Sequence, residues 1–248
     1  MKLDVVKISG HNSEMATRKP KSAVPRSRTK QRPAPPSAYH HGDLRNALID
    51  AAQTLLAERG VEGFTLRECA RRARVSHGAP AHHFGDVTGL LSAVAARGFE
   101  CLGKAMARYA DEAGNDASAR LTASGLAYID CALEHPATFQ LMFRCALTDP
   151  SRESLGKAGS AAYQALEAGL RAAQSRLRDA SKEDFLPDLL LHWSAVHGLA
   201  TLILEGQLDA HLGGRTRAQF GQEIGRRMLQ AMAKSLGKSA KVVAAAGC

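Results

Sequence analysis

Aromatic residues and long apolar runs are scarce in this chain, and their scarcity excludes two classes of protein. Aromatic residues make up 5% of its 248 residues, and runs of Val, Ile or Thr are few, which argues against a fold built from β-strands. No stretch of about eighteen consecutive apolar residues occurs, so the sequence contains no ordinary transmembrane helix. The opening stretch, MKLDVVKISGHNSEM, lacks the apolar core of a secretory signal peptide. We therefore expect a cytoplasmic protein, and abundant Ala, Leu and Arg favour helices.

The chain also lacks a C-x-x-C pair. Its cysteines are odd in number, which in a reducing compartment predicts free thiols that fill small apolar gaps; a redox sensor is the alternative. Adjacent histidines, as in His40-His41 and His82-His83, point about 100° apart on a helix, and no Cys or carboxylate stands at metal-ligand spacing from them. We expect no metal and no cofactor. The cysteines are Cys69, Cys101, Cys131, Cys145 and Cys248.

Positive charge is concentrated at the N-terminus. The net charge is +9, and residues 1–38 hold nine Lys or Arg against Asp4 and Glu14, so this segment alone carries +7. It is also rich in proline and cannot bury enough apolar surface to fold. We interpret residues 1–38 as a disordered basic arm that holds phosphates with salt-sensitive affinity. The alternative is a solvated leader, which translation from Met15 would shorten.

A helical pattern begins abruptly at Asp43. Leu44, Leu48 and Leu55 recur at helical spacing and predict a helix over 43–59, which Gly60 ends. In the next stretch, VEGFTLRECARRARVSHG, Thr65 and Glu68 fit a capping box, in which each side chain satisfies a backbone N–H of the other residue. A short helix over 66–73 follows. Two short helices joined by about three residues are the layout of a helix-turn-helix.

The stretch RVSHGAPAHHF combines a helix cap, a glycine, a proline and three histidines. We expect Ser76 to cap a third helix that starts at His77, with Pro80 as its fourth residue, where the missing N–H costs little. Gly78 and Ala79 leave little bulk at the helix tip, which lets it approach another surface closely. Phe84 is expected to anchor the far end in the core. Ser76 and His77 are neighbours on a cap, which rarely provides the geometry of a nucleophile and its base, so no enzyme is expected.

The rest of the chain is helical in pattern after Asp86, a predicted cap. Pairs such as His135-Pro136 and Gly213-Gly214 mark breaks, and residues from 237 onward are expected to form a flexible tail. The stretch 184–208 is apolar on several faces, which predicts a core on one side and a partner subunit on the other. We expect helices near 87–112, 117–134, 137–147, 154–178, 184–208 and 216–235.

Three blocks, YHHGDLRNALIDAAQTLLAERG, FTLRECARRARVSHGAPAHHFGD and GLLSAVAARGF, resemble the DNA-binding domain of TetR/AcrR-type transcriptional regulators. The second half, including GLAYIDCALEHPATFQLMF, resembles the ligand domain of a subgroup named for a Trp and a His-Gly pair. Here these are Trp193, His197 and Gly198 in LHWSAVHGLATLILEGQL. The resemblance covers roughly residues 39–210. It implies an all-α homodimer that binds a near-palindromic DNA operator and releases it when a small molecule enters the C-terminal domain.

The resemblance assigns the second helix to phosphate contacts and the third helix to the major groove, with His83 reaching the DNA backbone. Two positions depart from the family pattern: Ala81 stands where Tyr is frequent, and Val87 where Lys is frequent, and both usually help to hold phosphates. The basic arm, or the cluster of Arg71, Arg72 and Arg74, is a candidate to compensate. The implied DNA-binding residues are Thr65, Arg67, Ser76, His77, Gly78, Ala79, Ala81, His82 and His83.

The pocket of the C-terminal domain is harder to assign, because each candidate wall residue could equally be core. Trp193 and His197 form an i, i+4 pair on one helix face, for which packing is the first interpretation and a ligand contact the alternative. The candidate ligand-binding residues are Met106, Tyr128, Phe139, Met142, Phe143, Trp193 and His197.

Together these observations predict an all-α protein in which a three-helix helix-turn-helix domain precedes a helical ligand-binding and dimerisation domain. The expected divisions are a disordered arm over 1–38, a DNA-binding domain over 39–85, an effector and dimerisation domain over 86–236, and a flexible tail over 237–248. The expected function is a ligand-responsive repressor. The alternative is a small-molecule-binding or enzymatic helical bundle with a degenerate DNA-binding head, which Ala81 and Val87 favour.

Overall fold

The computed structural model describes residues 41–174 and 180–245, with side chains over 44–174 and 180–234. All of them belong to one compact unit, Tyr39–Cys248. Helices and turns account for these ranges, which contain no strand, so the predicted all-α fold is confirmed there. The expected basic arm lies outside the described residues. No helix in the described ranges is long and apolar enough to cross a membrane.

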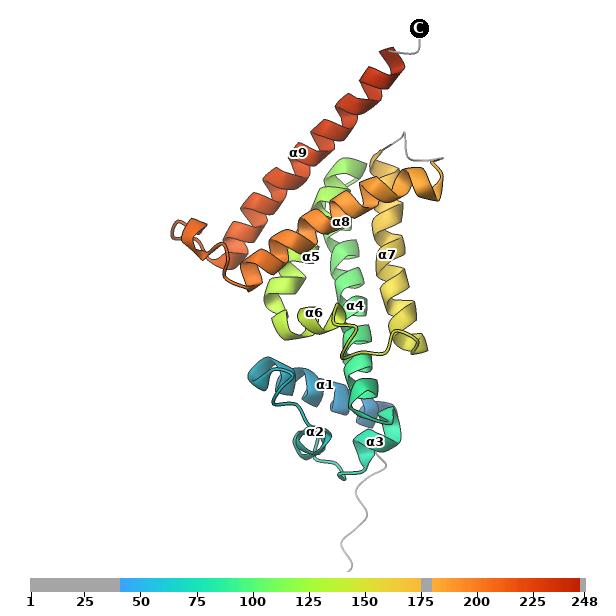
Figure 1. Ribbon diagram of the computed structural model, residues 1–248, viewed down its shortest axis with the longest axis vertical. Helices are drawn as coiled ribbons and strands as arrows, with labels where there is room; N and C mark the ends of the chain where they lie inside the picture. Colours follow the sequence, from blue (N-terminus) through green and yellow to red (C-terminus); the bar gives the residue numbers. More distant parts are fainter. Residues whose placement is uncertain (1–40, 175–179, 246–248) are drawn as a thin grey trace, which may run out of the picture. The chain divides into compact units, whose positions relative to one another are not determined.

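Three helices, two of them short, gather around the beginning of a long one (Figure 1). The long helix α4 then runs on between α5 and α7, and α8 and α9 lie against the far side of α5. We call α1–α3 the N-terminal domain and the remainder the C-terminal domain. The elements are α1 (His41–Arg59), α2 (Leu66–Arg72), α3 (Ala79–Phe84), α4 (Val87–Glu112), α5 (Ala117–Glu134), α6 (Pro136–Met142), α7 (Glu153–Ala173), α8 (Lys182–Leu204), the 3-10 helix η2 (Asp209–His211) and α9 (Arg217–Ala245).

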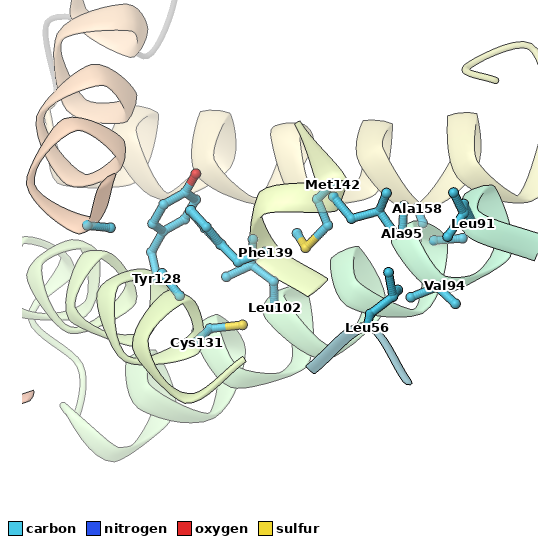
Figure 2. Close-up of a cluster of buried hydrophobic side chains, with 14 of the residues drawn as sticks. Leu56, Leu91, Val94, Ala95, Leu102, Tyr128, Cys131, Phe139, Met142 and Ala158 are labelled. Atoms are coloured by element: carbon cyan, nitrogen blue, oxygen red, sulfur yellow. The ribbon is translucent and has the colours of Figure 1, made fainter. Parts of the chain in front are cut away.

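A single hydrophobic core runs from the N-terminal domain into the C-terminal domain. Leu56 of α1 lies beside Leu91 and Val94 of α4, and the same cluster continues to Phe139 and Tyr128 (Figure 2). The Arg97 guanidinium adds a polar link, because it pairs with Asp50 of α1. Since cores are close-packed, a displacement of α4 on one side of this cluster is transmitted to α1.

The beginning of α4 is fixed by the predicted cap. The Asp86 carboxylate accepts a hydrogen bond of 2.7 Å from the backbone N–H of Gly89. Gly89 has to be glycine, because a Cβ there would lie 1.9 Å from the carbonyl oxygen of Phe84, the last residue of α3. The end of α3 therefore lies directly against the first turn of α4.

The turn between α2 and α3 is a Schellman motif with an unusual residue at its centre. The Val75 N–H donates to the carbonyl of Ala70 at 3.0 Å, and the Arg74 N–H donates to the carbonyl of Arg71 at 3.2 Å. Arg74 has φ +56° and is the one described non-glycine residue with a positive φ. This position is normally occupied by glycine, which adopts the left-handed conformation without steric cost.

The third helix begins later than the sequence predicted. Ala79 and Pro80 form its first turn, Gly78 precedes it, and Ser76 makes no side-chain cap. Residues 76–79 form a separate turn instead, in which the Ala79 N–H donates to the Ser76 carbonyl at 3.0 Å. Pro80 is the physical reason: its ring lacks an N–H donor and is best accommodated in a first turn.

Four further helix ends were predicted wrongly. Helix α7 ends at Ala173 rather than near 178. Helix α6 stops at Met142 rather than near 147, because Phe143 turns into a cluster of rings with Phe99 and Phe139. Helix α8 ends at Leu204, since Gly206 at φ +73° closes it with a second Schellman motif. Helix α9 continues to Ala245, so the predicted flexible tail is helical up to that residue.

The capping predictions had mixed outcomes. Thr65 accepts a hydrogen bond from the Glu68 N–H at 3.2 Å as predicted, but the Glu68 carboxylate binds Arg71 and Arg72 rather than returning to the cap. A complete box starts α9; its Thr-x-x-Gln pattern is present in the sequence but was not among the predictions. There the Gln219 side chain accepts from the Thr216 N–H at 2.9 Å, and the Thr216 hydroxyl accepts from the Gln219 N–H.

The left-handed backbone at Arg74 generates a stability prediction. Replacing Arg74 with Gly should raise the free energy of unfolding by about 0.5–1 kcal/mol, because glycine removes a steric cost of about 1–2 kcal/mol and adds some unfolded-state entropy. Urea denaturation of the two proteins measures the difference. Arg74→Ala is the matched control: it removes the same side chain but keeps the strain, and it should bring no gain. A glycine variant no more stable than the alanine variant would contradict the prediction.

Candidate DNA interface and ligand cavity

The N-terminal tip of α3 is open on its outer side. Pro80 and Phe84 are buried and hold the helix against the N-terminal domain, whereas Ser76, His77 and Gly78 are exposed. A Cβ placed on Gly78 would meet no atom within 4 Å. The tip can therefore approach an external surface closely, as the predicted contact with base edges requires.

The remaining groove-facing candidates lie on the same outer side. Ala81 and His82 are exposed, and Ala79 and His83 are half-buried. The His82 and His83 rings meet edge to face with their centroids 5.5 Å apart. In the described part of the chain, no three or more His, Cys, Asp or Glu side chains are placed to hold a metal ion.

The basic side chains of α2 and of the turn that follows it fall into two groups. Arg71 and Arg72 bind the Glu68 carboxylate at 2.7 and 3.3 Å, and Arg72 also binds Glu58 at 2.5 Å. These contacts, led by the hydrogen bond from Arg71, lower the pKa of Glu68 to about 2. The charges of Arg71 and Arg72 are thus largely neutralised within the domain, which weakens the hypothesis that the two compensate for missing phosphate contacts.

Arg67 and Arg74 form the second group. Both are exposed, and neither makes an ion pair with any described residue. Thr65, also exposed, lies at the start of the same helix. Val87 is 40% exposed at the first residue of α4. Ala81 and Val87 therefore project outward, and neither side chain can bind phosphate.

The C-terminal domain encloses a cavity of about 570 Å³, a size typical of small-molecule sites. Helices α4, α5, α7, α8 and α9 all contribute to its wall, for example through Phe99, Leu121, Gly159, Trp193 and Leu229. Its lining is mostly apolar, so it favours an apolar ligand.

The predicted ligand residues divide into two sets. Met106, Tyr128, Phe143 and Trp193 line the cavity. Phe139, Met142 and His197 do not; Phe139 and Met142 are buried core residues beneath Tyr128 and beside α4, as Figure 2 shows.

Sequence reasoning missed the wall that α7 contributes, together with His192 of α8. Ser160, Tyr163 and Gln164 line the cavity. Polar residues on an amphipathic helix are normally assigned to solvent, so no signal in the sequence distinguished them.

His197 belongs to a hydrogen-bonded ring cluster behind the cavity wall. The indole N–H of Trp193 donates to the Tyr128 oxygen at 3.4 Å. Among the described residues the Tyr128 hydroxyl hydrogen has Nδ1 of His197, 2.8 Å away, as its acceptor, so we assign the hydroxyl as the donor of that bond. The His197 ring packs against Phe143 at a centroid distance of 4.7 Å. Burial lowers the pKa of His197, which is consistent with the neutral ring that this bond requires. The Trp193–His197 pair therefore positions Tyr128 on the wall.

Arg152 connects the two domains. Its Nη1 donates to the Phe84 carbonyl at 3.2 Å, and the guanidinium lies 3.6 Å from Asp86 and 3.7 Å from Asp149. The backbone N–H of Asp149 in turn donates to the Ser92 hydroxyl of α4 at 2.8 Å. The loop between α6 and α7 is thereby tied to the end of α3 and the beginning of α4.

Both domains match sequence profiles of one family. Residues 48–94 match the profile described as "Bacterial regulatory proteins, tetR family", and residues 121–232 match "Tetracyclin repressor-like, C-terminal domain". The subgroup named for Trp and His-Gly stays a prediction.

Curated relatives are similar over the N-terminal part. The chain is 40% identical over 89 residues to the HTH-type transcriptional regulator BetI of Burkholderia thailandensis, which is 36% of this chain and 46% of the relative. It is 38% identical over 79 residues to BetI of Stenotrophomonas maltophilia, covering 32% and 40%. The matches thus span less than half the length of these relatives.

Solved structures are similar over most of the chain. A protein of unknown function from Rhodococcus sp. RHA1 is 33% identical with a TM-score of 0.64, over 79% of this chain and 99% of that one. The TetR family transcriptional regulator PfmR of Thermus thermophilus has 18% identity and a TM-score of 0.51, over 75% and 97%, a likeness that shows the fold. With its helix-turn-helix and its C-terminal domain each matching the same family, the chain belongs to the TetR family of transcriptional regulators.

Proposed function

We propose that this chain is a repressor that binds a near-palindromic operator as a homodimer and releases it when a small molecule enters the C-terminal cavity. The observation that supports it most directly is the uncovered tip of α3. Ser76, His77 and Gly78 are exposed on an element whose other side is anchored by Phe84. A short helix of this kind can enter the major groove with its N-terminal residues against base edges.

The proposed contacts divide between base edges and phosphates. His77 and His82 carry the polar groups that reach base edges, and Gly78 allows the close approach. Thr65 and Arg67 lie at the start of α2 and Arg74 lies in the turn before α3, and the two arginines have no competing carboxylate among the described residues. They are the phosphate contacts that offset the absence of Tyr at position 81 and Lys at position 87.

The proposed dimer forms through α8. Leu190, Leu191 and Leu202 are 44–47% exposed on the side of α8 opposite its buried face. Gly198 lies between Leu191 and Leu202 in the sequence, and a Cβ placed on it would meet no atom within 4 Å. Exposed leucines flanking a glycine favour close approach of a second helix, and a two-fold axis would repeat the same patch on both protomers.

The proposed switch acts through α4. Phe99, Leu102 and Met106 face the cavity, while the first turns of the same helix hold α3 through Gly89 and Asp86. Binding to the operator requires the two α3 tips to lie about one DNA turn, ~34–36 Å, apart. A ligand that binds better to a conformation with a different spacing therefore withdraws the protein from the operator. In this account the protein is a binding protein of the cytoplasm rather than an enzyme.

Selection of bound DNA from a random pool tests the proposed function. We expect an enriched site with two related half-sites, because each protomer presents one α3. Failure to enrich any sequence at low salt would contradict the proposal and favour the small-molecule-binding bundle with a degenerate DNA-binding head.

On the selected operator, Arg67→Ala should weaken binding of all sequences and lower the slope of log affinity against log salt by about 1, because one phosphate contact is lost. His77→Ala should instead reduce discrimination at its base pair by about 1–3 kcal/mol. Fluorescence anisotropy over a salt series measures both. Arg108→Ala, an exposed arginine on the C-terminal part of α4, is the control and should behave as wild type. Equal slopes for Arg67→Ala and the control would count against the assignment.

The dimer prediction concerns two leucines of α8. Leu191→Arg combined with Leu202→Arg should yield a monomer, because two charges would be buried without partners in the two-fold interface. Analytical ultracentrifugation gives the molar mass. Val87→Arg, which changes another exposed apolar residue on the N-terminal side of α4, should leave the dimer intact. A double variant that sediments as a dimer would refute the role of this face.

A further inference from the structure

His192 is a buried side chain of the cavity wall for which the family match supplies no role. It lies on α8, is 3% exposed and lines the cavity. Its Nδ1 is 2.9 Å from the carbonyl oxygen of Asp188. A carbonyl oxygen only accepts hydrogen bonds, so Nδ1 carries the proton and donates it.

The other ring nitrogen is an acceptor. Burial lowers the pKa of His192, so the ring is neutral and Nε2 bears a lone pair. Nε2 has no hydrogen-bond partner among the described residues. In the described part of the chain, the side-chain atoms that are fully enclosed and lack a hydrogen-bond partner are Arg152 Nε and Gln174 Oε1, and Nε2 of His192 is not among them. Nε2 therefore keeps some accessible surface, and the cavity that His192 lines is the space from which a donor can reach it.

The rest of the wall offers little to a charged ligand. Leu102, Met106 and Val196 are apolar, whereas Ser124, Ser160 and Gln164 are polar but uncharged. Glu167 is paired with Arg171 at 3.0 Å, and the Tyr128 hydroxyl is already engaged by Trp193 and His197. Lys182, at the first residue of α8, is exposed and lies at the rim of the lining, so no buried cation is present among the described wall residues.

We propose that the cavity takes a neutral, largely apolar ligand that donates one hydrogen bond, an alcohol or a phenol, to Nε2 of His192. This inference rests on the proposed role of the cavity as the effector site. An apolar ligand that covered Nε2 without offering a donor would leave a buried acceptor unpaired, which is costly, and a ligand hydroxyl supplies the missing donor. The apolar wall holds the carbon skeleton, while His192 selects the ligand by its single polar group.

A matched pair of probes tests the assignment. 4-Heptylphenol and its methyl ether differ in whether the oxygen carries a hydrogen or a methyl group, and calorimetric titration of the full-length protein measures their affinities. We expect the phenol to bind at least tenfold more tightly than the ether. In His192→Phe, which removes the acceptor but keeps an aromatic ring, the ratio should fall below about twofold. In His192→Gln, whose amide oxygen can accept, a preference for the phenol should return.

Tyr163→Phe is the control, because Tyr163 also lines the cavity but is 40% exposed; it should leave the ratio unchanged. Equal binding of phenol and ether by wild type, no binding of either, or tighter binding of 4-heptylbenzoate would each overturn the proposal. These outcomes are separate from the DNA test: an operator enriched from the random pool alongside equal phenol and ether affinities would leave the proposed function standing and the ligand class refuted.

Discussion

The close approach of α3 to the first turn of α4 is the constraint on which the rest of the structure depends. A Cβ at Gly89 would lie 1.9 Å from the Phe84 carbonyl oxygen, so only glycine permits this approach. The Asp86 carboxylate caps α4 at 2.7 Å, and the Arg152 guanidinium binds the same Phe84 carbonyl from the C-terminal domain. These contacts fix the angle of the proposed recognition helix relative to the helix that lines the cavity, so the two proposed sites are parts of one rigid connection.

Stability and binding place opposite demands on the neighbouring turn. Arg74 occupies a left-handed position at φ +56° that glycine would adopt without strain, and its charge is unpaired among the described residues. Strained residues persist where the surrounding structure holds them, and they concentrate at functional sites. Two arginines of α2 differ from Arg74: Arg71 is paired with Glu68, and Arg72 is paired with both Glu68 and Glu58. In the proposed function, the phosphate contacts that position 81 cannot provide therefore depend on Arg67 and Arg74.

Local rules predicted much of the fold, and tertiary packing decided the rest. The caps at Thr65 and Asp86 follow from side-chain chemistry that acts within one turn, and the burial of Phe84 was predicted from its hydrophobic side chain. The late start of α3 follows from Pro80, whose preference for a first turn outweighs the cap that Ser76 offers. The cavity wall was less predictable, because a polar residue such as His192 enters it only through the packing of α8 against α5 and α7. Arg152, in a loop predicted as a helix break, carried no signal of its contact with Phe84.

The contribution of Arg152 can be measured directly by backbone amide hydrogen exchange. Exchange at residues 84–91 should be compared between wild type, Arg152→Ala and Arg144→Ala, the last removing an exposed arginine of the same loop. If Arg152 holds α3 against α4, then Arg152→Ala alone speeds exchange there and alone weakens operator affinity, with the C-terminal helices still protected. Unchanged exchange at this junction, or equal effects of both substitutions, would contradict the claim that this contact sets the orientation of α3.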